Sequence, residues 1–161
     1  MFALPDLEEV LAYRHPKVIR AYQRDFPHLR DQAENLFREA LKYLWLSRKH
    51  QLDCESRPND SALDFPFFMH EEMRDIDNMW HTFLLYTQDY TDFCRRFFGD
   101  YLHHQPDIAD AVVQTNQEFG ADLEKYLSYV YDQLGEETVR AWFAMHLVES
   151  GGEESVTAAV S

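Results

Sequence analysis

The chain contains little cysteine and little glycine, and it has no long run of apolar residues. Its two cysteines, Cys54 and Cys94, do not form a C-x-x-C pair. Two isolated cysteines exclude a disulfide framework and favour a reducing compartment. No apolar run approaches the roughly 20 residues that a transmembrane helix requires, and the N-terminal residues lack the basic and apolar regions of a signal peptide. We therefore expect a cytoplasmic protein.

Basic residues are also scarce. The chain carries 15 Lys and Arg against 29 Asp and Glu, which gives a formal net charge of −14. This charge repels nucleic-acid phosphates and anionic membrane lipids, and the basic residues are scattered among acidic ones along the sequence. We therefore expect neither a nucleic-acid partner nor a membrane partner, and a protein is the remaining class of macromolecular partner.

Hydrophobic residues, by contrast, are abundant enough to build a core. They make up 45% of the 161 residues, and aromatic residues alone make up 15%. Apolar residues recur at steps of three and four in several segments, whereas no useful stretch alternates as a strand does. The sequence predicts an all-α protein, a single compact bundle of about six or seven helices. We expect this domain over residues 1–148 and a disordered, Gly/Ser/Glu-rich tail over 149–161.

Proline and glycine indicate where several helices begin and end. Pro16 suits the first position of a helix over residues 16–25. Gly99 suits the left-handed position that follows a helix over residues 87–98. Further helices are expected at about 7–13, 28–50, 70–86, 107–134 and 136–148. Turn residues dominate 51–69, where we expect the Phe65–Phe68 segment to lie extended against the helices.

Histidines and aspartates gather around one predicted helix. Asp77 and His81 are four residues apart and therefore share a helix face. His70 precedes His81 by about three turns and is expected on nearly the same face. The doublet His103-His104 follows the next helix, and two helices joined by a short loop are typically antiparallel. We therefore expect the doublet to return towards Asp77 and His81.

A carboxylate and several imidazoles form a suitable ligand set for a divalent metal. The sequence predicts a metal site, with zinc as the first choice of cofactor, and its ligands are Asp77, His81, His103 and His104. Three protein ligands would leave a coordination position for water. Neither an H-E-x-x-H motif nor the E-x-x-H pairs of di-iron helical bundles occurs, and no catalytic residue can be assigned.

Two other interpretations stay open, and whether the chain is an enzyme is not decided. The first is a metal-free interaction module, in which Asp77 and His81 only support a helix and the Phe65–Phe68 segment covers or forms a groove for a partner helix. The second is a metal-dependent hydrolase, in which a metal-bound water acts as the nucleophile. The hydrolase ranks last because no general acid or base stands out.

The sequence around these candidates also resembles a known family. The similarity rests on Asp75-Ile76-Asp77-x-x-Trp80-His81-Thr82-Phe83, Tyr90-x-x-Phe93-Cys94, Gly99 and Leu102-His103-His104-x-Pro106. These strings resemble the glycine-rich domain-containing-protein-like family, in its short bacterial stand-alone form. The resemblance implies a helical domain without established catalytic residues, and it covers about residues 75–106. Its matching positions include the four candidate metal ligands.

Overall fold

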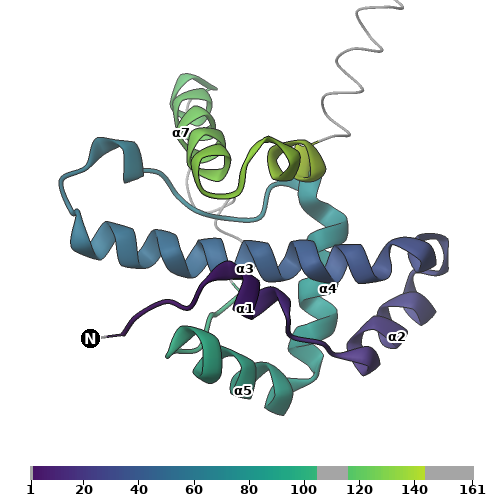
Figure 1. Cartoon of the computed structure of the whole chain (residues 1–161). Helices are drawn as coiled ribbons and strands as arrows, with labels where there is room; N and C mark the ends of the chain where they lie inside the picture. Colours follow the sequence, from purple (N-terminus) through teal and green to yellow (C-terminus); the bar gives the residue numbers. More distant parts are fainter. Residues whose placement is uncertain (1, 105–115, 144–161) are drawn as a thin grey trace, which may run out of the picture.

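The computed structural model describes residues 2–104 and 116–143. The all-α prediction is confirmed, because these residues form helices joined by loops and short 3-10 turns, without a strand among them. The helices are α1 (Leu7–Leu11), α2 (Pro16–Asp25), α3 (Ala33–Ser56), α4 (Arg74–Leu85), α5 (Thr87–Phe98) and α7 (Asn116–Leu134), followed by helical residues 136–143 (Figure 1). The first part of the helix predicted over 107–134, the end of the last helix and the tail over 149–161 lie outside the described residues.

Helix α3 runs through the middle of the molecule. Figure 1 shows α1, α2 and α5 on one side of it and α7 with residues 136–143 on the other, while α4 crosses it. Four consecutive residues of α3, Tyr43 to Leu46, are buried. Consecutive residues point to different sides of a helix, so α3 is covered on more than the single apolar face that its sequence predicted.

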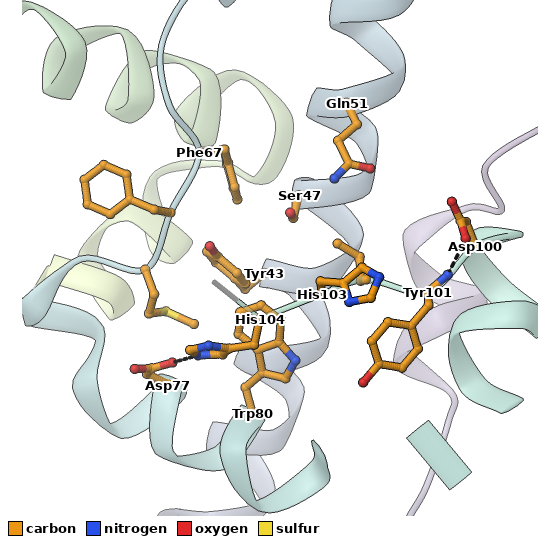
Figure 2. Close-up of a pocket in the computed structure, with 13 residues that line it drawn as sticks. Tyr43, Ser47, Gln51, Phe67, Asp77, Trp80, Asp100, Tyr101, His103 and His104 are labelled. Carbon is orange, nitrogen blue, oxygen red and sulfur yellow. Dashed lines mark hydrogen bonds and ion pairs between the residues drawn. The ribbon is translucent and has the colours of Figure 1, made fainter. Parts of the chain in front are cut away.

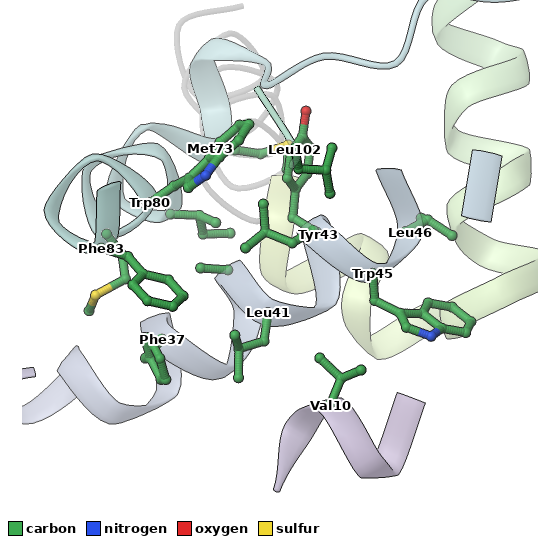
Figure 3. Packing of buried hydrophobic residues seen from close by; sticks show 14 of the residues in the cluster. Val10, Phe37, Leu41, Tyr43, Trp45, Leu46, Met73, Trp80, Phe83 and Leu102 are labelled. Atoms are coloured by element: carbon green, nitrogen blue, oxygen red, sulfur yellow. The ribbon is translucent and has the colours of Figure 1, made fainter. Parts of the chain in front are cut away.

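Aromatic side chains fix α4 against α3. The ring centroids of Tyr43 and Trp80 lie 5.5 Å apart, and those of Phe37 and Phe83 lie 5.6 Å apart. Figure 3 shows these rings within the buried cluster. Aromatic pairs at such distances add to the free energy gained by burying apolar area. This packing sets the orientation of α4, the helix that carries Asp77 and His81.

Local sequence signals predicted the ends of two helices correctly. Helices α2 and α5 cover the predicted residues, and Gly99 adopts a φ of 72° after α5. The His15 ring caps α2 by accepting a hydrogen bond from the Val18 amide at 3.1 Å. Its other nitrogen lies 2.6 Å from the Asp89 carboxylate of α5, which ties the two helices together.

Two other helix boundaries differ from the prediction. The expected helix over 28–50 begins as a 3-10 turn, Pro27–Gln32, and continues as α3 to Ser56. An ion pair between Lys49 and Asp53 at 3.0 Å, four residues apart on the helix, supports the extension. The helix expected from His70 begins instead at Arg74, after a 3-10 turn over Glu71–Met73.

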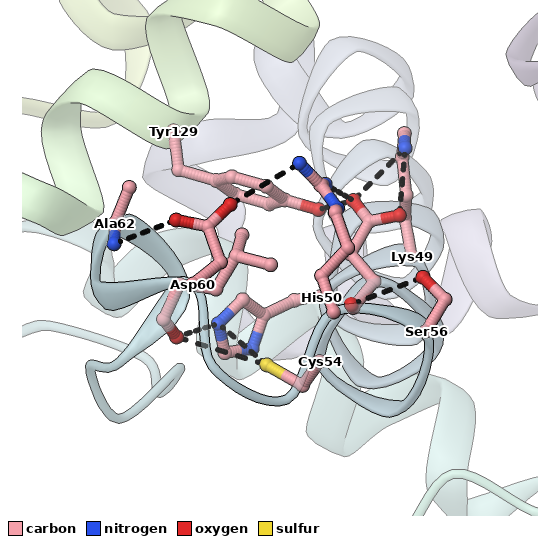
Figure 4. A network of polar contacts seen from close by, with 10 residues as sticks. Lys49, His50, Cys54, Ser56, Asp60, Ala62 and Tyr129 are labelled. Atoms are coloured by element: carbon pink, nitrogen blue, oxygen red, sulfur yellow. Dashed lines mark hydrogen bonds and ion pairs between the residues drawn. The ribbon is translucent and has the colours of Figure 1, made fainter.

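A group of polar side chains anchors the loop that follows α3 (Figure 4). We call it the Asp53 network, and its members are Lys49, His50, Asp53, Cys54, Arg57 and Tyr129. The Tyr129 hydroxyl donates to the Asp53 carboxylate at 2.7 Å, and His50 Nε2 donates to the Leu63 carbonyl at 3.0 Å. Burial and the neighbouring Asp53 charge raise the pKa of the Cys54 thiol, which disfavours a reactive thiolate.

Candidate metal centre

Three of the four predicted ligands meet at the start of α4. Asp77, His81 and His104 each offer a ligand atom, and these atoms lie within 4.8 Å of one another. His104 Nε2 lies 2.8 Å from Asp77 Oδ1, and His81 Nδ1 lies 4.0 Å from the same oxygen. The two imidazole rings have centroids 4.3 Å apart. We call these three residues the Asp77 cluster.

The connector after α5 places His104 in this cluster. The Tyr90 hydroxyl donates to the Leu102 carbonyl at 2.7 Å and accepts a hydrogen bond from Trp80 Nε1 at 3.1 Å. Leu102 is buried, and the Trp80 ring lies 4.4 Å from the His104 ring. The connector is therefore anchored, two residues before His104, to Tyr90 of α5. Tyr90 is in turn held by Trp80 of α4.

His103, the fourth predicted ligand, lies outside the Asp77 cluster. Its side chain is exposed, and its ring lies 4.6 Å from the Tyr101 ring in an edge-on arrangement. Figure 2 shows His103 and His104 pointing in different directions from the connector. Neighbouring side chains of a non-helical segment do not have to share a direction. Only His104 of the doublet therefore reaches the Asp77 cluster.

His70 also lies apart from the cluster, contrary to the expectation from helical spacing. The reason is that α4 begins only at Arg74, so His70 does not share the helix of His81. Its ring stacks on Phe68 at 4.2 Å and meets Tyr126 at 4.5 Å. Its Nε2 is buried without a hydrogen-bond partner, and burial lowers its pKa to about 4.

The Asp77 cluster is open on one side. The exposed fraction of the side chain is 49% for His81, 27% for Asp77 and 11% for His104. Asp77 also lies in the first turn of α4, where the helix dipole favours a negative charge. The arrangement offers a carboxylate and two imidazoles to an ion and leaves the side of His81 accessible to solvent.

A pocket of about 340 Å³ lies beside the cluster (Figure 2). Asp77 and His104 form part of its wall, together with three polar residues of α3: Tyr43, Ser47 and Gln51. The histidine and aspartate pattern of the sequence did not indicate these three residues. Their spacing of four and eight positions places them on one helix face, and this was the only sequence signal that could have indicated them.

The Phe65–Phe68 segment packs against the helices as expected. Phe65 is buried, and the Phe67 ring lies 5.2 Å from Tyr43 and 5.0 Å from Tyr126. Phe67 and Phe68 are only half-buried, and both line the pocket. Complete burial of both rings would exclude a groove for a partner helix at this segment. Because both rings are only half-buried, the groove stays a prediction.

Part of the chain matches a known protein family. Residues 67–141 match the family described as UCP032817-like. The resemblance to the glycine-rich domain-containing-protein-like family is therefore wrong, because the residues on which it rested, 75–106, fall within this match. Its separate strings are short, and short strings recur in unrelated helical proteins. No curated protein and no solved structure matches the chain.

The described helices also bear on the membrane prediction. None of the helices in residues 2–104 and 116–143 is both long enough and apolar enough to span a bilayer.

Proposed function

We propose that this protein binds a divalent transition metal, with zinc as the first choice, through Asp77, His81 and His104. The observation that carries the proposal is the convergence of three ligand atoms within 4.8 Å. Neutral imidazole and carboxylate are ordinary zinc ligands, and three of them with an open position are typical of a catalytic rather than a closed structural site.

The required adjustment of the side chains is small. Zinc–ligand bonds of about 2.0–2.2 Å in a tetrahedron place neighbouring ligand atoms about 3.4 Å apart. The distance between His81 Nδ1 and Asp77 Oδ1 would shorten from 4.0 Å. The distance between His104 Nε2 and the same oxygen would lengthen from 2.8 Å. His81 is the most exposed of the three side chains, so its imidazole can rotate without disturbing the core.

A purely structural role is the competing explanation of the same contacts. In that case the Asp77–His104 hydrogen bond fixes the connector, and His81 contributes only weakly to the helix. The two explanations differ in what His81 does. A structural pair does not need His81, whereas an ion held by three ligands loses much of its affinity without it.

Elemental analysis and calorimetric titration with zinc test the proposal on protein purified without a histidine tag. We expect about one zinc per chain, and His81→Ala or Asp77→Asn should weaken binding by at least about tenfold, since even outer-shell partners contribute about 10- to 100-fold. His28→Ala, an exposed histidine far from the cluster in the sequence, is the control. His103→Ala should also retain zinc. A protein without bound zinc, or His81→Ala with unchanged affinity, would contradict the proposal.

Metal-dependent hydrolysis is the second candidate function. The observation that favours it is that Asp77 and His104 both line the pocket, so a molecule in the pocket lies next to the ion position. A zinc-bound water can supply hydroxide near neutral pH. Zinc-dependent hydrolysis of p-nitrophenyl acetate by the wild type and His28→Ala, but not by His81→Ala, would support this function. Equal rates in all three proteins would contradict it.

A further inference from the structure

The pocket is lined by a buried tyrosine whose hydroxyl opens onto it and bonds to no described residue. Tyr43 is 3% exposed, it lines the pocket, and its hydroxyl has no hydrogen-bond partner among the described residues (Figure 2). The ring is buried but the hydroxyl is not among the buried unpaired atoms, so it can bond to whatever occupies the pocket. The other buried tyrosines all donate to a protein atom, and these are Tyr22, Tyr90, Tyr126 and Tyr129. Tyr43 is the exception among the described buried tyrosines, and its hydroxyl is available to a molecule in the pocket.

Two further polar groups of α3 continue the line that begins at Tyr43. Ser47 and Gln51 follow at four-residue steps, and Figure 2 shows their polar ends directed into the same pocket. The Ser47 hydroxyl also has no partner among the described residues. The Gln51 carbonyl oxygen accepts a hydrogen bond from Arg48 at 3.0 Å, which leaves its amide N–H groups for another acceptor.

The charge of the pocket selects against anions. Its described wall carries the carboxylates of Asp77 and Asp100 and no Lys or Arg. The sequence has no Lys or Arg between Arg96 and Lys125, so the residues after the connector cannot supply one either. Asp100 accepts a hydrogen bond from the Tyr101 amide through one oxygen at 2.8 Å, and its second oxygen is available to a cation.

We propose that this pocket binds a small amine that also carries hydroxyl groups. The ammonium group pairs with the Asp100 carboxylate, and the hydroxyl groups bond to Tyr43, Ser47 and Gln51. The pocket volume of about 340 Å³ lies at the lower end of the about 300–1,000 Å³ found for small-molecule sites. The inference goes beyond metal binding, because none of these four residues belongs to the Asp77 cluster.

Three sugars of the same ring size separate the effect of charge from that of shape. Glucosamine is a cation, glucose is neutral and glucuronate is an anion, so ligand-observed NMR titrations of the full chain compare charge on similar scaffolds. We expect glucosamine to bind more tightly than glucose, and glucuronate to bind most weakly. Glucuronate binding as tightly as glucosamine, or no binding of any of the three, would overturn the proposal.

Two substitutions test the individual groups. Tyr43→Phe should weaken glucosamine and glucose alike by about three- to tenfold, the range for one net hydrogen bond. Asp100→Asn should weaken glucosamine alone by about two- to fivefold, since Asp100 is exposed. The exposed Tyr131→Phe and Asp92→Asn, outside the pocket, are the matched controls. Unchanged glucosamine affinity in Tyr43→Phe, with an unchanged melting temperature, would refute the assignment.

The same titrations in the presence of a chelator, and with His81→Ala, separate this proposal from the metal proposal. Retention of the affinity order under both conditions supports an amine site that is independent of the ion. Binding that requires zinc and disappears in His81→Ala would overturn the amine site while leaving the metal proposal intact. Conversely, a protein that binds glucosamine but no zinc would contradict only the metal proposal.

Discussion

The Asp53 network and the Asp77 cluster both combine aspartate with histidine, yet they differ in how completely the protein satisfies them. In the Asp53 network, the carboxylate accepts hydrogen bonds from Tyr129 and Lys49, and His50 donates to a main-chain carbonyl. In the Asp77 cluster, the His81 ring packs against His104, and its polar contact within the described residues is a 4.0 Å approach to Asp77. The pocket beside it is lined by Tyr43, whose hydroxyl has no partner among the described residues.

The comparison shows that residue types alone do not identify a binding site. Buried polar atoms are normally hydrogen-bonded, and those that are not require an explanation. The Asp53 network is explained by its own contacts, which hold the loop after α3. In the Asp77 cluster, by contrast, His81 Nδ1 lies 4.0 Å from Asp77 Oδ1, and the Tyr43 hydroxyl of the adjoining pocket bonds to no described residue, so our proposals concern that region.

The largest expected effect tests how strongly burial disfavours the charged form of a histidine beside the pocket. His70 Nε2 has no partner, and burial lowers its pKa from 6.5 to about 4. Between these two pH values the unfolded chain binds a proton that the folded protein does not, so stability falls as pH falls. The loss should reach roughly 3 kcal/mol at about 1.4 kcal/mol per pKa unit.

Urea denaturation of the wild type and His70→Phe between pH 7 and pH 4 measures this loss. The wild type should lose stability more steeply than His70→Phe over that interval, while the exposed His28→Phe should follow the wild type. Parallel curves for the wild type and His70→Phe would show that burial does not lower the pKa of His70.

Zinc should stabilise the protein through the Asp77 cluster alone. At a free zinc concentration 100 times the dissociation constant, linkage predicts a gain of about 2.7 kcal/mol in the free energy of unfolding. The gain should disappear in His81→Ala and persist in His28→Ala. A similar gain in His81→Ala would move the metal site elsewhere and remove the distinction between the two regions.

Removing each aspartate in metal-free protein compares the two regions directly. Burial raises the pKa of Asp53, but the hydrogen bonds from Tyr129 and Lys49 and the nearby positive charges lower it overall, so the folded state stabilises the carboxylate. This contribution is lost as pH falls below 3.8 and through the depressed pKa. Asp53→Ala should cost about 2 kcal/mol at pH 7 and Asp77→Ala about 1 kcal/mol or less. Equal losses by chemical denaturation would contradict the comparison.

The smallest expected effect compares two buried tyrosines. The Tyr90 hydroxyl holds the connector through Leu102 and Trp80, so Tyr90→Phe should lower the free energy of unfolding by about 1–2 kcal/mol. Tyr43→Phe removes a hydroxyl that bonds to no residue in 2–104 or 116–143, and it should change stability by less than about 0.5 kcal/mol. Thermal denaturation of both variants is sufficient, and a loss in Tyr43→Phe as large as that in Tyr90→Phe would show that Tyr43 has a structural role.

Local sequence signals predicted the parts of the fold that depend on a few neighbouring residues. Pro16 fixed the start of α2 and Gly99 the end of α5, because each suits one backbone position. The short connection between α4 and α5 also indicated that the second helix folds back along the first. This arrangement brings His104 to Asp77.

Features that depend on distant packing were not predictable in this way. The late start of α4, which removes His70 from the cluster, and the different directions of His103 and His104 are set by contacts with other elements. Tyr43, Ser47 and Gln51 line the pocket because α3 is covered on several sides. The apolar periodicity of α3 alone does not show which face meets a cavity.

A crystal of the protein grown with zinc, with diffraction recorded on both sides of the zinc absorption edge, tests the central claim most directly. We expect one anomalous peak at about 2.0–2.2 Å from the ligand atoms of Asp77, His81 and His104. Zinc bound at other residues would contradict it. So would a map without a peak in which the 2.8 Å hydrogen bond between Asp77 and His104 persists.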